Sequence, residues 1–165
     1  MSSSSKVAFL AIVLRTLVSS CPLGKTYDLT FFVISSSNDM IACNSKPAVN
    51  AVITSYSISE SPSLPLIWNV SATDDAYDCE LTKYFFVSGI PTGALVDVFT
   101  DDFTIMKIND VQVSSISTTS GCTFQKDKDV LAYIRPGLNT LYIKAINSMG
   151  LGYTGYRLTI KIKLI

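Results

Sequence analysis

The chain has 165 residues, of which 48% are hydrophobic and 16% charged, and its 13 Lys and Arg residues balance its 13 Asp and Glu residues. This length suits one domain with a buried core, and the balanced charge without basic runs argues against nucleic-acid binding. Histidine is absent, which removes the commonest general base and metal ligand and excludes every Ser-His or Cys-His catalytic pair.

The first 24 residues form an apolar N-terminal segment ahead of a β-rich domain at residues 25–165. The apolar run Val7–Leu14 is shorter than the roughly 20 residues of a membrane-spanning helix. One interpretation is a cleaved signal peptide, or a lipoprotein signal in which Val18-Ser19-Ser20-Cys21 places a lipid on Cys21. The alternative is a retained helix whose apolar face contacts a membrane surface or a neighbouring subunit.

From Lys25 onward, short β-rich runs alternate with clusters of Ser, Asn, Asp, Gly and Pro, and no helical period of useful length appears. The fold class is therefore all-β. Turns at intervals of roughly ten residues favour an antiparallel two-sheet β-sandwich of the jelly-roll type. The expected strands are residues 27–34, 48–58, 64–68, 83–87, 94–99, 104–108, 111–114, 128–134, 140–147 and 155–163.

The last expected strand has the clearest alternation, which predicts one core face and one solvent face. Its apolar residues are Tyr156, Leu158, Ile160, Ile162 and Leu164, and they alternate with Arg157, Thr159, Lys161 and Lys163. Upstream, Asn109-Asp110 lies between two short apolar strands and predicts a two-residue hairpin turn, because Asn tolerates a positive φ. Arg135-Pro136-Gly137 predicts a sharp turn before the strand at 140–147.

Several motifs follow one another in a characteristic order. One strand ends in Asp101-Asp102, the next ends at Asn109-Asp110, and a turn Pro136-Gly137-Leu138-Asn139 precedes a strand ending in Asn147. With these motifs the chain, from about residue 61 onward, resembles the galactose-binding-domain-like β-sandwiches, in which the second strand ends in Asn-Gly. Members of that family include sugar-binding modules, adhesion domains and structural domains of large virions, so the resemblance does not select a function.

Two groups of carboxylates are candidate metal sites. Asp101 and Asp102 could bind Ca²⁺ through their oxygens, and Asp74, Asp75 and Asp78 form a second group in another loop. The alternative is that these side chains accept hydrogen bonds from backbone N–H groups at turns. We expect no other cofactor.

Aromatic side chains near loops could stack on sugar rings or contact a protein partner. Tyr153, in a glycine-rich loop, is the strongest candidate for an exposed ring, and Tyr77 and Trp68 are further candidates. Core packing is the competing expectation for Trp68 and Tyr156, because large aromatic residues dominate sandwich interiors. The resemblance also extends to Trp68 and to the aromatic strand Tyr84-Phe85-Phe86.

The four cysteines are Cys21, Cys43, Cys79 and Cys122, and their wide spacing argues against a zinc knuckle or a CxxC redox motif. They allow two disulfides, or four buried free thiols in a reducing compartment. Asn69-Val70-Ser71 is an N-glycosylation sequon, which makes Asn69 a modification site if a eukaryote secretes the chain.

Two functions remain open. The first is a non-enzymatic structural protein, such as a minor capsid or surface component of a large virion or a similar extracellular assembly, which contacts protein neighbours and copies of itself. High apolar content, balanced charge and absent histidine favour it. The alternative is a secreted or lipid-anchored carbohydrate-binding module, favoured by the family resemblance and by Val18-Ser19-Ser20-Cys21. Both place the chain on a virion or a cell surface, or outside the cell.

Overall fold

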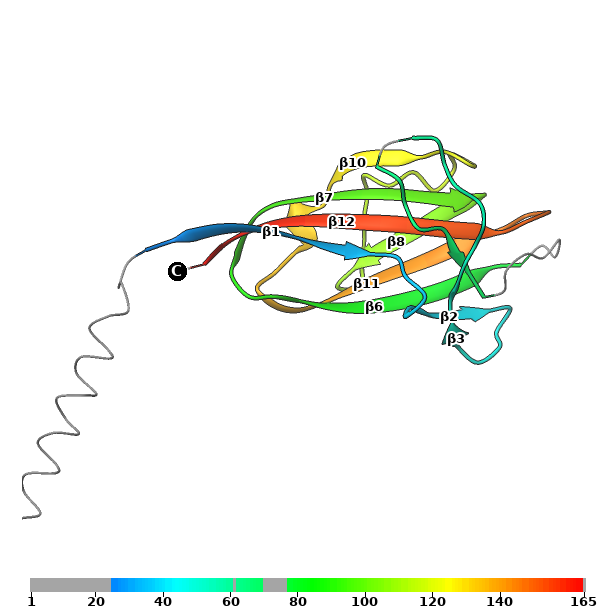
Figure 1. The fold of residues 1–165 in the computed structure, drawn as a ribbon, viewed down its shortest axis with the longest axis horizontal. Helices are drawn as coiled ribbons and strands as arrows, with labels where there is room; N and C mark the ends of the chain where they lie inside the picture. Colours follow the sequence, from blue (N-terminus) through cyan, green and yellow to red (C-terminus); the bar gives the residue numbers. More distant parts are fainter. Residues whose placement is uncertain (1–24, 61, 70–76, 165) are drawn as a thin grey trace, which may run out of the picture.

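The computed structural model describes residues 25–60, 62–69 and 77–164. Predictions that fall on the apolar N-terminal segment, including Cys21, and on Asp74 and Asp75 lie outside the described residues. The described chain forms two antiparallel six-stranded sheets that pack face to face (Figure 1). The predicted all-β, two-sheet sandwich is therefore confirmed.

The first sheet is organised around the strand closest to the C-terminus. In spatial order it contains β10 (Gln125–Asp129), β7 (Ile90–Asp101), β12 (Tyr153–Leu164), β5 (Ile67–Trp68) and β4 (Val52–Ile53), and β1 (Tyr27–Ile34) also pairs with β12. One edge of β12 pairs with β7 along nearly its whole length. The opposite edge is shared by β1, at residues 157–164, and by β5, at Thr154.

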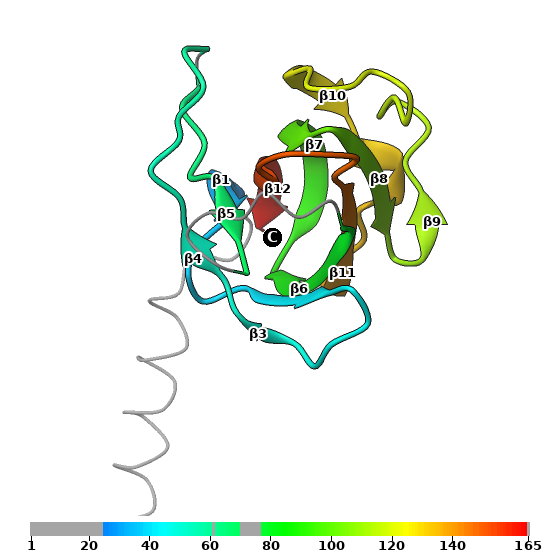
Figure 2. The ribbon, with the colours of Figure 1, turned by 90° about the vertical axis from the view of Figure 1, so that its right-hand side faces the viewer.

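The second sheet contains the remaining strands. Their spatial order is β3 (Val49–Asn50), β2 (Met40–Cys43), β6 (Cys79–Val87), β11 (Gly137–Ile146), β8 (Phe103–Ile108) and β9 (Val111–Gln112). The strands β5 to β8 alternate between the two sheets, and so do β10 to β12. Figure 2 shows these two layers end on. This repeated crossing is the connection pattern expected of a jelly roll.

The core lies between the sheets and is built from alternate residues of each strand. In β12 the predicted alternation is confirmed, because Tyr156, Leu158, Ile160 and Ile162 are buried. Their partners on the facing sheet include Leu81 and Val87 of β6 and Leu141 and Ile143 of β11. Burial of this apolar surface is the main stabilising contribution to the fold.

Two buried carboxylates, Asp39 and Asp97, form ion pairs at the border of this interior with the half-buried Lys83 and Arg157. The carboxylate of Asp39, between β1 and β2, is 2% exposed and accepts a hydrogen bond from the Lys83 ammonium group of β6. It also accepts hydrogen bonds from the Tyr156 hydroxyl, at 2.9 Å, and from the Ser36 amide, at 3.2 Å. These contacts satisfy the buried charge and hold the β1–β2 connection against both sheets.

Two predicted turns form as expected. Asn109 and Asp110 both have positive φ, 50° and 65°, and Ile108 pairs with Val111 across the turn. The Asn109 amide group donates to the Asn139 side-chain oxygen at 2.8 Å. Asn139 in turn bonds the backbone of Arg135 and Gly137. These two asparagines therefore have structural roles and stabilise adjacent turns.

Parts of the predicted strand pattern are wrong. The stretch 48–58 does not form one strand: β3 belongs to the second sheet and β4 to the first, and buried Ala51 marks the crossing between them. The predicted strand 128–134 stops at Asp129, whose carboxylate accepts the Leu131 amide at 2.9 Å and starts a 3-10 turn, Leu131–Tyr133. Strand β2 is not predicted at all.

Candidate functional site

Three connections meet at one end of the sandwich, around Asp102. This residue lies between β7 and β8, and its amide donates to the Ile146 carbonyl at 2.7 Å. Its carbonyl accepts the Cys122 amide at 2.8 Å, and its carboxylate accepts the Ser148 amide at 2.8 Å. Asp102 therefore ties the β7–β8, β9–β10 and β11–β12 connections together, which is the turn-stabilising role that the sequence offered as an alternative to metal binding.

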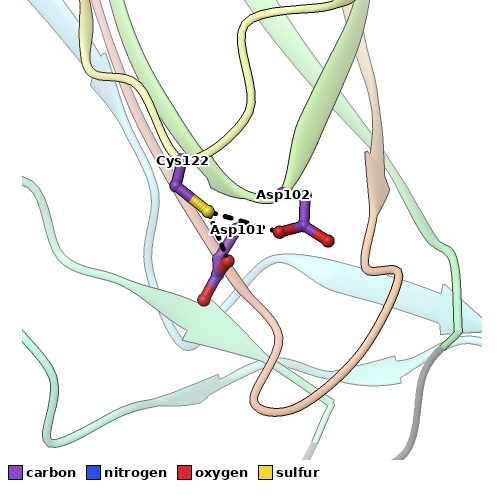
Figure 3. A group of neighbouring side chains, drawn as sticks. All are labelled: Asp101, Asp102 and Cys122. Carbon is purple, nitrogen blue, oxygen red and sulfur yellow. Dashed lines mark hydrogen bonds between the residues drawn. The ribbon is translucent and has the colours of Figure 1, made fainter.

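The thiol of Cys122 sits between two carboxylates (Figure 3). Its Sγ donates to Asp101 Oδ1 at 2.8 Å and to Asp102 Oδ1 at 3.2 Å. The ligand atoms of these three residues all lie within 4.8 Å of one another. The structure thus brings both predicted aspartates together and adds a cysteine that sequence reasoning did not place with them.

The carboxylates keep this thiol protonated. Hydrogen bonding to Asp101, followed by burial, raises the pKa of Cys122 to about 12. Burial raises the pKa of Asp101 despite the hydrogen bonds that it accepts from Cys122 and Tyr153, whereas the Ser148 amide lowers the pKa of Asp102. At neutral pH the thiol is therefore a hydrogen-bond donor, and it lacks the thiolate form that nucleophilic catalysis requires.

The protein atoms of this cluster supply only part of a calcium coordination shell. Calcium takes six to eight oxygen ligands, and the cluster offers two carboxylates and a thiol whose pKa is about 12. A softer cation would bind the sulfur only after displacing its proton. The predicted calcium site therefore has no part in the function proposed below.

The predicted exposed aromatic, Tyr153, belongs to a stack beside this cluster. Its ring lies 5.2 Å from that of Tyr56, with an interplanar angle of 13°, and 5.9 Å from that of Phe99, at 16°. Tyr56 forms the outer layer and is 40% exposed. Tyr153 itself is half-buried, so Tyr56 is the most exposed of the three stacked rings, and the sequence did not single it out.

The other predicted aromatic residues are also partly or fully buried. Trp68 is completely buried, so its assignment as a ligand-facing residue is wrong and the expectation of core packing is confirmed. Tyr77 is half-buried, stacks on Trp68 at 5.8 Å and donates from its hydroxyl to Asn69 Oδ1 at 2.9 Å. Asn69 remains a predicted glycosylation site, and the rest of its sequon lies outside the described residues.

Tyr77 also lines an open cavity of about 340 Å³. The cavity is bounded by Ala42, Asn44, Ser45, Tyr77, Asp78, Glu80 and Lys144. Lys144 Nζ contacts Asp78 Oδ2 at 2.8 Å, and this pairing raises the pKa of Lys144. Asp78, predicted as a candidate metal ligand, is therefore engaged in an ion pair with a half-buried lysine.

The three cysteines within the described residues divide into two kinds. Cys43 of β2 and Cys79 of β6 are paired residues on neighbouring strands and form a buried disulfide. Cys122 is a free, exposed thiol. Of the predicted alternatives, the structure favours a disulfide over free thiols at these two positions.

The outer face of the second sheet carries a patch that sequence reasoning missed. We define the sheet-face patch as Tyr84 and Phe86 of β6 and Leu138 of β11. Phe86 and Leu138 are directly paired across the two strands. Tyr84 lies two residues before Phe86 in β6, so its side chain is on the same face of the sheet. The signal was present in the alternation of Tyr84-Phe85-Phe86, where buried Phe85 faces the core and its two neighbours must face outward.

An open depression of about 510 Å³ adjoins the patch. It is lined by Thr82, Tyr84, Lys107, Asp110, Thr140 and Tyr142. The Lys107 ammonium group lies 5.5 Å from the centre of the Tyr142 ring, a cation–π geometry. The patch therefore has an apolar centre with charged and hydroxyl groups at its border.

No protein-family model, curated protein or solved structure matches this chain. The resemblance to galactose-binding-domain-like sandwiches accordingly stays a prediction, carried by its motifs alone. Among the described residues, no helix combines the length and apolar character that a membrane crossing needs.

Proposed function

We propose that this chain is a non-enzymatic structural protein that contacts protein neighbours in an assembly through its sheet-face patch. The observation that carries the proposal is the exposure of three adjacent apolar side chains, 65% for Tyr84, 65% for Phe86 and 58% for Leu138. Contiguous exposed apolar surface bordered by polar groups is typical of protein–protein contact sites.

The composition of this surface supports a protein partner. Aromatic residues are enriched at interface centres and contribute most of the binding energy there. Full burial of a Phe side chain contributes about 1.5–3 kcal/mol, and Phe86 keeps 65% of its surface exposed for such burial. The finer proposal, a surface or minor capsid component of a virion or similar extracellular assembly, is favoured by the high apolar content, the balanced charge and the absence of histidine, and the patch adds only a surface for protein contact.

The assembly role also agrees with the chemistry of the charged groups. The cluster of Asp101, Asp102 and Cys122 holds a protonated thiol in hydrogen bonds. In the Asp39–Lys83 pair the carboxylate is buried and the ammonium group is half-buried. In both places the ionisable groups stabilise the fold, which supports a protein that binds without performing a reaction.

Hydroxyl-radical footprinting tests this proposal. We expect Tyr84 and Phe86 to be oxidised readily in the isolated full-length chain and to be protected at least fivefold in the assembly isolated from the native source. Met149, which is 80% exposed in the β11–β12 connection, is the internal control and should be oxidised equally in both samples. Equal oxidation of Tyr84 and Phe86 in the two samples would refute the proposed contact.

Carbohydrate binding is a second candidate, favoured by the stacked rings of Tyr56 and Tyr153 beside two carboxylates. An exposed aromatic ring next to hydrogen-bond acceptors provides the stacking and polar contacts that a sugar requires. A glycan screen of the full-length chain would test it, with Tyr56→Ala expected to abolish any signal and Phe86→Ser expected to retain it. A screen with no ligand, or a ligand indifferent to Tyr56→Ala, would exclude this site.

A further inference from the structure

Strand β1 has one edge that pairs with no strand in the described part of the chain. Its other edge pairs with β12 from Tyr27 to Ile34. Four of its apolar residues are well exposed: Tyr27 (54%), Leu29 (48%), Phe32 (54%) and Ile34 (39%). A long apolar strand with one open edge is a template for pairing with another strand.

The ladder with β12 determines which backbone groups face the open edge. Just beyond β1, the Ser35 amide donates to the Tyr156 carbonyl at 3.0 Å. Bonds to one neighbour come from alternate residues of an antiparallel strand, so the odd-numbered residues of β1 face β12. The N–H and C=O groups of Asp28, Thr30, Phe32 and Ile34 therefore point toward the open edge.

This edge lacks the features by which other edges avoid pairing. At the far side of the same sheet, β10 contains the sequence Gln-Lys-Asp-Lys-Asp, with four charges. The outermost strands of the second sheet, β3 and β9, have two residues each. Strand β1 has eight residues with no Pro, Gly or Lys and a single charge at Asp28. Charged and very short strands block edge-to-edge association, and β1 has neither property.

We infer that β1 binds the β1 strand of a second copy in antiparallel orientation, which joins the first sheets of two molecules into one continuous sheet. The inference rests on the proposed assembly function and names one of the neighbours, but it uses a surface separate from the sheet-face patch. A two-fold symmetric contact of this kind is self-complementary, because each copy supplies the same strand.

The register follows from the open-edge residues. A two-fold axis at Phe31 places Asp28 opposite Ile34 of the second copy and Thr30 opposite its Phe32. All four open-edge residues are then paired, and four pairs that each exchange two bonds give about eight N–H···O hydrogen bonds. A shift of the axis by one residue in either direction leaves Asp28 or Ile34 without a partner in β1.

The side chains are compatible with this register. Asp28, the single charge of β1, faces Ile34 of the second copy, so no like charges meet across the strands. Within each chain Ile34 pairs with Arg157, whose guanidinium is already held by the Asp97 carboxylate at 3.0 Å, so Asp28 of one copy approaches a neutralised ion pair of the other. The chain as a whole has a formal net charge of zero, so long-range repulsion does not oppose association.

Sedimentation of the full-length chain over a concentration series tests the pairing. We expect a monomer–dimer equilibrium, and Thr30→Lys should raise the dissociation constant at least tenfold by placing a charge on the open edge. Thr92→Lys, the same change at an exposed strand position of β7, should leave the constant unchanged. A monomeric wild type throughout the series, or an undisturbed dimer in Thr30→Lys, would overturn the inference.

Cysteine cross-linking tests the register. In a Cys21→Ser, Cys122→Ser background, Phe31→Cys places a thiol on the two-fold axis and should form a covalent dimer under mild oxidation, because directly opposite residues have Cβ atoms about 4.5–5.5 Å apart. Leu29→Cys faces Val33 of the second copy and should cross-link at least fivefold less. Equal cross-linking of the two variants, or none in Phe31→Cys, would overturn the register.

The experiments distinguish failure of the sheet-face patch contact from failure of the β1 pairing. Protection of Tyr84 and Phe86 in the native assembly with no β1 dimer would leave the assembly function standing and overturn only the strand pairing. Protection of β1 in the assembly by a chain of different sequence would likewise overturn the inference, since the occupant would not be a second copy. A β1 dimer without protection of the sheet-face patch would support the inference and refute the proposed patch contact.

Discussion

Removal of the Cys43–Cys79 disulfide should lower the free energy of unfolding by about 4 kcal/mol at 25 °C. The bridged residues are separated by 36 positions, and the loss of chain entropy in an unfolded loop of this length corresponds to that stabilisation. The bridge matters locally as well, because it holds the four-residue strand β2 against β6. The double variant Cys43→Ser, Cys79→Ser is the direct perturbation.

Urea unfolding provides the assay, because the single tryptophan, Trp68, is completely buried and reports loss of the core by fluorescence. Reduction of the wild type should reproduce the stability of the double variant, and a reductant should have no effect on the double variant itself. Cys122→Ser serves as the control for loss of a thiol outside the bridge. A double variant within about 1 kcal/mol of wild type would refute the entropic reasoning.

The charged groups give two more predictions. Cys122 is exposed but has a pKa of about 12, so its thiol should react slowly with iodoacetamide at pH 8. Asp101→Asn should raise the rate of this reaction severalfold, and equal rates in the variant and the wild type would contradict the role of the carboxylate. Because the pKa of Cys122 in the folded protein exceeds the ordinary thiol value of 9.0, the stability that this thiol contributes is full below pH 9.0 and is lost as the pH rises toward 12. In urea titrations Cys122→Ser should reduce that loss. Asp39→Asn leaves the half-buried Lys83 ammonium without its counter-charge and should cost about 1.5–3 kcal/mol in urea unfolding. Adding Lys83→Met should recover most of this cost, because the side-chain oxygen of the introduced asparagine can still accept the Tyr156 hydroxyl; a cost below about 0.5 kcal/mol for Asp39→Asn would show that the pair contributes little.

The strands with clear alternation were the ones that could be predicted. The limits predicted for β1 are those observed, and the strand predicted at 155–163 extends to Tyr153–Leu164. The turn at Asn109-Asp110 was predictable because its residue types favour positive φ. The sequence could not show that residues 48–58 divide between two sheets, because that crossing depends on partners distant in the chain, such as Asp39, whose carbonyl accepts the Ala51 amide at 2.8 Å.

The candidate site was predicted only in part, for a similar reason. Asp101 and Asp102 are adjacent in sequence and easily noticed, whereas Cys122 reaches them only because the β9–β10 connection folds back across the end of the sandwich. Tyr56 likewise meets Tyr153 from nearly a hundred residues away. The disulfide was open to prediction as a possibility, but its pairing follows from the register of β2 with β6, which no local pattern encodes.

The partnership of β1 with β12 has a consequence for biosynthesis. The Ser35 hydroxyl bonds the backbone of Tyr156, 121 residues later in the chain. At about 5–20 residues per second, translation needs roughly 6–24 s to span this interval. Throughout that time β1 has emerged without its sheet partner, so both of its edges are open while neighbouring ribosomes on one message produce identical strands. Association of nascent chains can therefore begin before either domain has finished folding.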